Sequence, residues 1–277
     1  MTATNCRTPV LARVTPVRLA CALAVLSWLG STRADVFTNP DIPSAETSYF
    51  TLVYQKLIPV NSPGWNGMAV PYEVNNSGAI SGQPFKRVAY YWELQKPTGG
   101  ADWLYVSVDA FTADVGKLGI PNTTSGAFFQ QFLSNMNVYS NVPGIVAGTG
   151  LTTGNIEFWP SNYGQNNDKG VPGASSSSFD FGDGGAGTGT GHGSMQLHNY
   201  GAAQTLFAYN GWGAARTSEL GLGNQPGGSS VNPDWTFNTS NISNYTSRTL
   251  QVLVLIPEPA SLTLLALGSL LLRRRRG

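Results

Sequence analysis

The sequence predicts an all-β fold, a single β-sandwich or jelly-roll-like domain, with an N-terminal signal helix before it and a short C-terminal hydrophobic helix after it. Apolar residues recur in short runs that are rich in β-branched and aromatic side chains. Clusters of Gly, Asn, Pro and Ser separate these runs, as turns do. No apolar stripe of helical period lasts more than three turns, and there is no internal repeat, so about ten short strands in one domain are expected.

Seven runs are long enough to be predicted individually as strands. In the run 103–111, Leu104, Val106 and Val108 alternate with Tyr105, Ser107 and Asp109, which is the period of a half-buried strand. The segment 126–133 (GAFFQQFL) is the best short helix, and the glycine-rich segment 182–193 is expected to be a long flexible loop. The predicted strands are 49–58, 87–94, 103–111, 155–159, 194–198, 205–209 and 249–256.

The first 34 residues have the pattern of a secretory signal peptide. Arg7, Arg13 and Arg18 precede an apolar run, 19–30, which is too short to span a bilayer. Small residues at Thr32 and Ala34 follow, so we place the cleavage after Ala34. The alternative is a buried N-terminal helix.

The cysteine count restricts the chemistry of the mature protein. The chain has 2 cysteines, Cys6 and Cys21, and both lie in the signal. The exported body therefore has no disulfides, and its stability comes from burial and hydrogen bonds. Cysteine proteases, zinc–cysteine sites and iron–sulfur clusters are excluded.

The net charge of the full chain, +1, does not describe the body. Of the 16 basic residues, 4 lie in the signal and 4 at the C-terminus, which leaves 8 in the body. Of the 15 acidic residues, 14 lie in 35–255 and Glu258 lies in the tail, so the net charge of the body is −6. An acidic body disfavours nucleic acids and anionic membrane surfaces as partners.

The C-terminal segment 256–277 has three parts in a fixed order: a Pro-Glu-Pro motif, an apolar stretch and a basic end. The stretch 260–272, as a helix, would reach about 20 Å, against about 30 Å of hydrocarbon, so it spans a bilayer only marginally. We interpret it as a stop-transfer arm that holds the exported body at the outer face of the inner membrane, with the arginines in the cytoplasm. An ordinary single-span anchor is the alternative. The residues concerned are Pro257, Glu258, Pro259, Arg273, Arg274, Arg275 and Arg276.

These three parts resemble the PEP-CTERM sorting signal of Gram-negative bacteria that make extracellular polysaccharide. The resemblance implies that an exosortase-type membrane enzyme recognises Pro257, Glu258 and Pro259 and processes the tail. The final location would then be the cell envelope or the extracellular space, after a transient inner-membrane intermediate. The apolar segment is shorter than is usual for this signal.

The body, 35–255, has a second resemblance. The segments DAFTADVGKLGIP, GNIEFWPSNYG, HGSMQLHNY and ELGLGNQPGG are similar to a β-rich domain of uncertain function that accompanies secreted sialate O-acetylesterases. No catalytic module accompanies it in this chain.

Four aromatic residues near turn residues are candidates for ligand binding. A flat ring beside amides and carboxylates suits a sugar, which has apolar C–H faces and a rim of hydroxyls. Core packing is the simpler explanation for any one of these rings, and Phe158, Phe181, Phe207 and Phe237 are expected in the core. The candidates are Trp159, Tyr163, Trp212 and Trp235.

Asp168, Asp180 and Asp183 flank the glycine-rich segment and are candidate calcium ligands. The strict EF-hand spacing is absent, and turn hydrogen bonds explain these acids as well. Calcium is the one cofactor the sequence suggests.

No catalytic residue is assigned. The only histidines are His192 and His198, without a GxSxG or HExxH motif, so a structural role is the simpler interpretation. A glycosidase would need two carboxylates, and Glu157 with Asp180 or Asp183 is the best pair available.

Four asparagines stand in Asn-x-Ser/Thr patterns and mark polar surface loops: Asn122, Asn238, Asn241 and Asn244. The sequence as a whole predicts an exported, non-catalytic envelope or matrix protein that binds polysaccharide. A carbohydrate-active hydrolase and a passive matrix protein are the alternatives.

Overall fold

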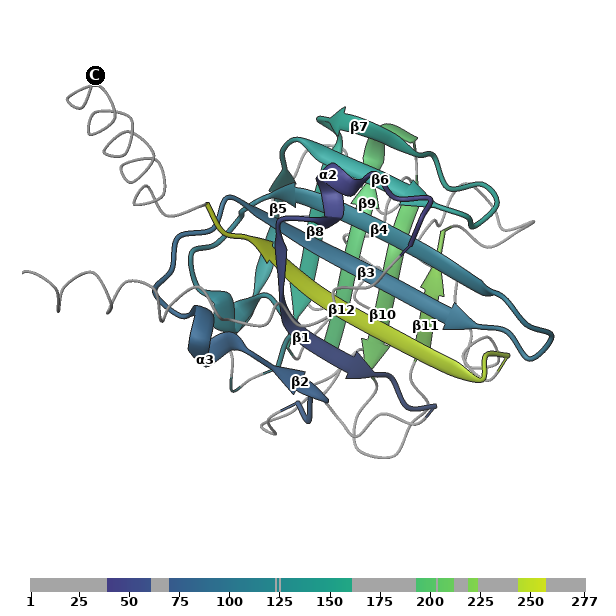
Figure 1. Ribbon diagram of the computed structural model, residues 1–277, viewed down its shortest axis with the longest axis horizontal. Coiled ribbons are helices and arrows are strands. Elements are labelled where there is room, and N and C mark those ends of the chain that lie inside the picture. The colour runs from purple at the N-terminus through teal and green to yellow at the C-terminus, as the bar shows by residue number, and fades with distance from the viewer. Residues whose placement is uncertain are drawn as a thin grey trace, which may run out of the picture. The chain divides into compact units, whose positions relative to one another are not determined.

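The computed structural model describes residues 39–60, 70–122, 124, 126–160, 193–202, 204–211, 219–223 and 244–257. Within them two antiparallel sheets pack face to face, which confirms the predicted all-β sandwich (Figure 1). The chain changes sheet four times, at β4–β5, β5–β6, β7–β8 and β11–β12.

The elements have the following bounds. The seven-stranded sheet contains, in spatial order, β2 (Val74–Asn75), β1 (Phe50–Leu57), β12 (Ser247–Leu255), β3 (Arg87–Gln95), β4 (Ala101–Asp109), β6 (Met136–Ser140) and β7 (Gly148–Leu151). The five-stranded sheet contains β11 (Glu219–Leu222), β10 (Gln204–Gly211), β9 (Gly193–Asn199), β8 (Gly154–Trp159) and β5 (Phe129–Leu133). Short helical turns are α2 (Ser44–Thr47), α3 (Ser77–Ile80), η2 (Val115–Lys117) and η3 (Tyr200–Ala202).

The segment predicted as a helix, 126–133, is wrong: residues 129–133 form the edge strand β5, which pairs with β8. The inward residues Phe129 and Leu133 are four positions apart, and so are the outward residues Phe128 and Phe132. A spacing of four fits one face of a strand and one face of a helix alike, so the pattern could not separate them. Of the expected loop 182–193, Gly193 begins β9, and the remainder lies outside the described residues.

The core lies between the sheets and is built from alternate residues of each strand. The largest side chains in it are aromatic, and Phe207 contacts both Tyr90 and Trp92 at ring-centroid distances of 5.5 and 5.4 Å. Phe158 and Phe207 are fully buried, as predicted. The other two predicted core rings, Phe181 and Phe237, lie outside the described residues.

A second apolar cluster covers the opposite face of the seven-stranded sheet. Residues 42–48, which we call the N-terminal strap, cross that face, and Ile42 packs there with Phe50 and Tyr105 (Figure 1). As predicted, Leu104, Val106 and Val108 face the core. Strand β4 is not half-buried, however, because the strap also buries Tyr105 and Ser107.

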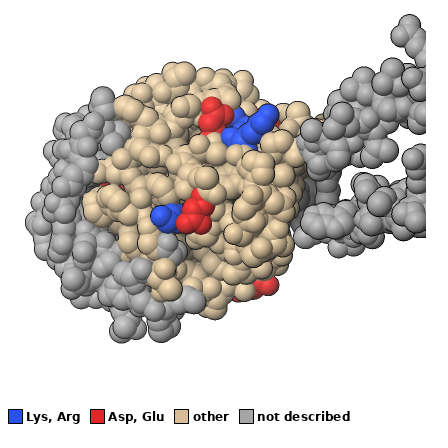
Figure 2. All heavy atoms as spheres, turned by 90° about the vertical axis from the view of Figure 1, so that its left-hand side faces the viewer, with Lys and Arg blue, Asp and Glu red and all other residues tan. Residues whose placement is uncertain are grey.

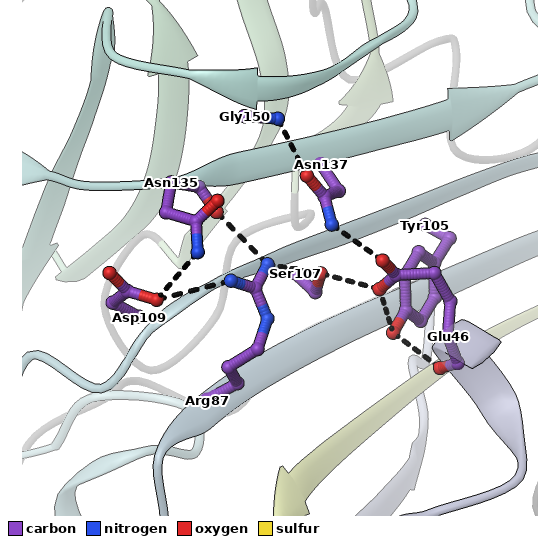
Figure 3. Close-up of polar contacts among 8 residues, drawn as sticks. All are labelled: Glu46, Arg87, Tyr105, Ser107, Asp109, Asn135, Asn137 and Gly150. Atoms are coloured by element: carbon purple, nitrogen blue, oxygen red, sulfur yellow. Dashed lines mark hydrogen bonds and ion pairs between the residues drawn. The ribbon is translucent and has the colours of Figure 1, made fainter.

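Glu46 fastens the strap to the sheet (Figure 3). Its Oε2 accepts hydrogen bonds from Ser107 Oγ at 2.8 Å and Tyr105 OH at 3.3 Å, and its Oε1 accepts one from Asn137 Nδ2. The Tyr105 hydroxyl also donates to the Glu46 carbonyl at 2.7 Å. One carboxylate thus joins the strap to β4 and β6.

Replacing Glu46 by alanine is expected to lower the free energy of unfolding by about 2 kcal/mol, since the buried Ser107 hydroxyl and its neighbours lose a charged acceptor. Chemical denaturation measures this. Asp41→Ala is the matched control, because Asp41 is exposed directly before the strap and its carboxylate makes no hydrogen bond within the described residues. It should change the free energy by less than about 0.5 kcal/mol. Equal effects of the two substitutions would contradict a fastening role for Glu46.

Candidate functional site

The structure describes only part of the candidate site predicted from sequence. Trp159, Glu157 and His198 lie within it, on β8 and β9. The other candidates lie outside the described residues, and so does the sorting tail from 258 onward. They are Tyr163, Trp212, Trp235, Asp168, Asp180, Asp183, His192, Ala34, Glu258, Pro259, Arg273, Arg274, Arg275 and Arg276. Over the described residues no three His, Cys, Asp or Glu side chains group as metal ligands would.

Trp159 is packed rather than open to solvent. It is the last residue of β8, its exposed fraction is 5%, and it faces away from the core. Its indole Nε1 donates to Glu157 Oε1 at 2.6 Å, and its ring meets Phe128 edge-on at a centroid distance of 4.8 Å. Trp159 is therefore a packed residue of the outer face of the five-stranded sheet, where it contacts Glu157 and Phe128.

On that outer face, buried polar side chains of β8 and β9 form a row connected by hydrogen bonds. The register of β8 and β9 places Asn155 opposite His198 and Glu157 opposite Gln196. His198 Nδ1 lies 2.9 Å from Asn155 Oδ1 and His198 Nε2 lies 3.1 Å from Gln196 Oε1, while Gln196 Nε2 donates to Ser194 Oγ at 2.8 Å. Alternation along two neighbouring strands thus gives a polar face opposite the apolar core face.

Burial lowers the pKa of His198 to about 3, so the imidazole is neutral near pH 7. A neutral imidazole has one N–H, and therefore only one of the two amide oxygens beside it can accept from the ring. Turning the Asn155 amide places its NH₂ toward Nδ1, and Nδ2 otherwise has no hydrogen-bond partner among the described residues. His198 is thus a satisfied structural group, as the sequence indicated.

Exposed aromatic rings occur along β5, at the edge of the same sheet. Phe128 is 49% exposed and Phe132 is 42% exposed. The ring of Phe132 lies 5.5 Å from that of Tyr200. Between them, Gln130 is opposite Glu157 on β8, and neither polar atom of its amide has a hydrogen-bond partner within the described residues. We call Phe128, Gln130 and Phe132 the β5 aromatic edge.

The sequence analysis missed the β5 aromatic edge because it assigned these residues to a helix. The signal that could have found it is a Phe-x-Gln-x-Phe alternation, which places both rings and the amide on one face of a strand. Rings four residues apart on a strand are separated by about 13 Å.

Pro257 is the one residue of the sorting motif that is described. It follows the end of β12 by two residues and is partly exposed, so the predicted tail begins directly after the last strand. Among the described elements, no helix combines the length and apolar character needed to cross a membrane.

Two of the four Asn-x-Ser/Thr asparagines are described. Asn122 has an exposed fraction of 6%, so it does not lie on a surface loop as expected, whereas Asn244 is exposed. Asn238 and Asn241 lie outside the described residues.

Comparisons with family models, curated proteins and solved structures find no match to this chain.

The buried, neutral His198 predicts acid sensitivity. Its pKa is about 6.5 when unfolded and about 3 when folded, so between these values the unfolded chain binds a proton that the folded chain does not. Stability is therefore full above pH 6.5 and falls with pH, by about 2 kcal/mol from pH 7 to pH 5. Urea denaturation at several pH values measures this loss. His198→Gln should remove it from the pH profile, and an unchanged profile would show that His198 is not its source.

Proposed function

We propose that this protein is an exported, non-catalytic protein of the cell envelope or extracellular matrix, sorted by its C-terminal tail, which binds polysaccharide through its β-sandwich. The signal pattern of residues 1–34 and the Pro-Glu-Pro, apolar and arginine segments of 256–277 support the export and the sorting. The acidic, cysteine-free body suits a partner that is neither nucleic acid nor an anionic membrane surface.

The observation that carries the binding proposal is the β5 aromatic edge. Two large rings remain in contact with water on one face of an edge strand, with an unsatisfied amide between them. Burial of the two rings would stabilise the fold, so their exposure is unfavourable. The Gln130 amide is shielded from water and has no hydrogen-bond partner within the described residues, which is also unfavourable. A sugar chain would cover the two exposed rings with its C–H faces.

The hydrolase alternative requires a second carboxylate near Glu157. On β5, β8, β9 and β10 the only acidic residue is Glu157, which is buried and bonded to Trp159. Its predicted partners, Asp180 and Asp183, lie outside the described residues, so this alternative stays a prediction. It is tested by Glu157→Gln in any hydrolytic activity detected: an unchanged rate would exclude Glu157 as the acid.

Changing the tail motif tests the sorting part of the proposal. Replacing Pro257, Glu258 and Pro259 by alanine should leave the tail uncleaved and the protein in the inner-membrane fraction. Mass spectrometry of both termini, on protein from its native cells, measures this, and Pro40→Ala in the exposed N-terminal turn is the control. Recovery of the intact 277-residue chain from the cytosol would refute the export of the wild-type protein.

Removing either exposed ring tests the binding part. Phe128→Ala and Phe132→Ala should each weaken retention on polysaccharide affinity gels about tenfold, because each removes one stacking surface. Val146→Ala, an equally exposed apolar side chain between β6 and β7, should have no effect. No retention of the wild-type protein on a broad panel of glycans would favour the passive matrix alternative.

A further inference from the structure

A pocket of about 410 Å³ lies beside the β5 aromatic edge, where the end of β4 approaches β5. This volume is in the range of sites that hold small ligands. Phe132 belongs both to the β5 aromatic edge and to the wall of this pocket. The lining residues are Asp109, Ala110, Phe111, Gln131, Phe132, Leu133 and Ser134.

Asp109, one of the lining residues, has one carboxylate oxygen held in place by hydrogen bonds. Its Oδ1 accepts from Arg87 Nη1 and from Asn135 Nδ2, each at 3.1 Å (Figure 3). No hydrogen bond to Asp109 Oδ2 is found among the described residues, and the side chain is 48% exposed. An ionised carboxylate oxygen accepts hydroxyl donors readily, and holding the other oxygen in place lowers the entropic cost of such a contact.

Phe111, one of the two aromatic lining residues of the pocket, packs against rings of the core side. Phe111 meets Phe129 edge-on at 5.0 Å and Phe158 at 6.3 Å, and Phe158 is a core ring. Phe132 forms the exposed side. Rings and a carboxylate acceptor therefore occur together in a space that would hold one ring-sized ligand.

The charges around the pocket disfavour an anion. Arg87 bonds to Asp109, to Ser107 Oγ at 2.7 Å and to the Asn135 carbonyl at 2.9 Å, so these N–H donors are already engaged within the protein. None of the lining residues is Lys or Arg, and the five-stranded sheet has neither along its strands. The backbone carbonyl of Lys86, a residue with an exposed side chain, accepts from the Ala110 N–H. Figure 2 shows one face of the molecule on which the described part carries few charged side chains, with blue and red side by side.

We propose that this pocket is a subsite for one uncharged pyranose ring of a glycan. The sugar ring stacks on Phe132 and donates hydroxyl hydrogen bonds to Asp109 Oδ2. An acidic sugar, such as a uronic acid, is disfavoured because its carboxylate would approach that of Asp109 in a pocket whose lining contains no Lys or Arg. The inference rests on the proposed polysaccharide binding and specifies its ligand class.

The experiment uses the full exported chain and two sets of probes of equal length: neutral hexose oligomers, and the corresponding uronic acid oligomers. We expect the wild-type protein to bind at least one neutral oligomer at least tenfold more tightly than its acidic counterpart. Asp109→Asn should weaken neutral binding about tenfold and reduce the discrimination against the acidic oligomer. Isothermal titration measures both.

The matched control is Asp102→Asn. Asp102 lies near the other end of β4 and pairs with Lys96, so its substitution also disrupts an ion pair but not the pocket. Because Asp109→Asn also weakens the contact with Arg87, Ala110→Leu provides a second variant that fills the pocket without changing charge. Thermal unfolding verifies that each variant is folded.

The outcomes separate the two proposals. Neutral binding that both pocket variants weaken and Asp102→Asn does not would support the subsite. Equal or tighter binding of the acidic oligomers would overturn the ligand class, and neutral binding that neither pocket variant changes would overturn the pocket, while polysaccharide binding itself would stand. An absence of binding to every oligomer and polysaccharide would refute both.

Discussion

The guanidinium of Arg87 holds the corner at which the chain passes from one sheet to the other. From the start of β3 it bonds to Ser107 and Asp109 of β4 and to the carbonyl of Asn135, which lies between β5 and β6. Asn135 has a φ of 50°, a left-handed conformation that asparagine tolerates better than most residues and that permits the sharp reversal. Because Ser107 also bonds to Glu46, the corner, the strap and the pocket beside β5 belong to one polar network.

The sandwich buries polar side chains on the outer faces of both sheets, and it does so without disulfides. Each of these groups must find a partner, since an unpaired polar atom in the interior costs about 1–3 kcal/mol. On the five-stranded sheet the partners come from neighbouring strands, as in the Asn155–His198–Gln196 series. On the seven-stranded sheet they come both from neighbouring strands, as in Gln251 with Gln55, and from the strap, as in Ser107 with Glu46. Gln130 differs in that neither polar atom of its amide has a partner within the described residues, and it lies between the two exposed rings.

The all-β class and the long strands could be predicted from sequence. Runs such as 87–94 and 249–256 are long, mostly apolar and contain aromatic or β-branched residues. Short strands could not: β7 is Gly-Thr-Gly-Leu, and β5 has a spacing that also fits a helix. Trp159 was found as an aromatic beside turn residues, but its burial depends on Phe128 and Glu157. Asp109 was noted only as an outward residue, since its role depends on Arg87 and Asn135, which lie 22 and 26 residues away.

The position of β12 determines when this domain can form. This last strand lies between β1 and β3, so without it β1 and β2 are separated from the rest of their sheet. Ribosomes make the N-terminus first, and residues 247–255 are therefore among the last of the body to be synthesised. Until they emerge, the two halves of the sheet have open edges and an incomplete core. The seven-stranded sheet is therefore completed only after the last strand of the body has been made.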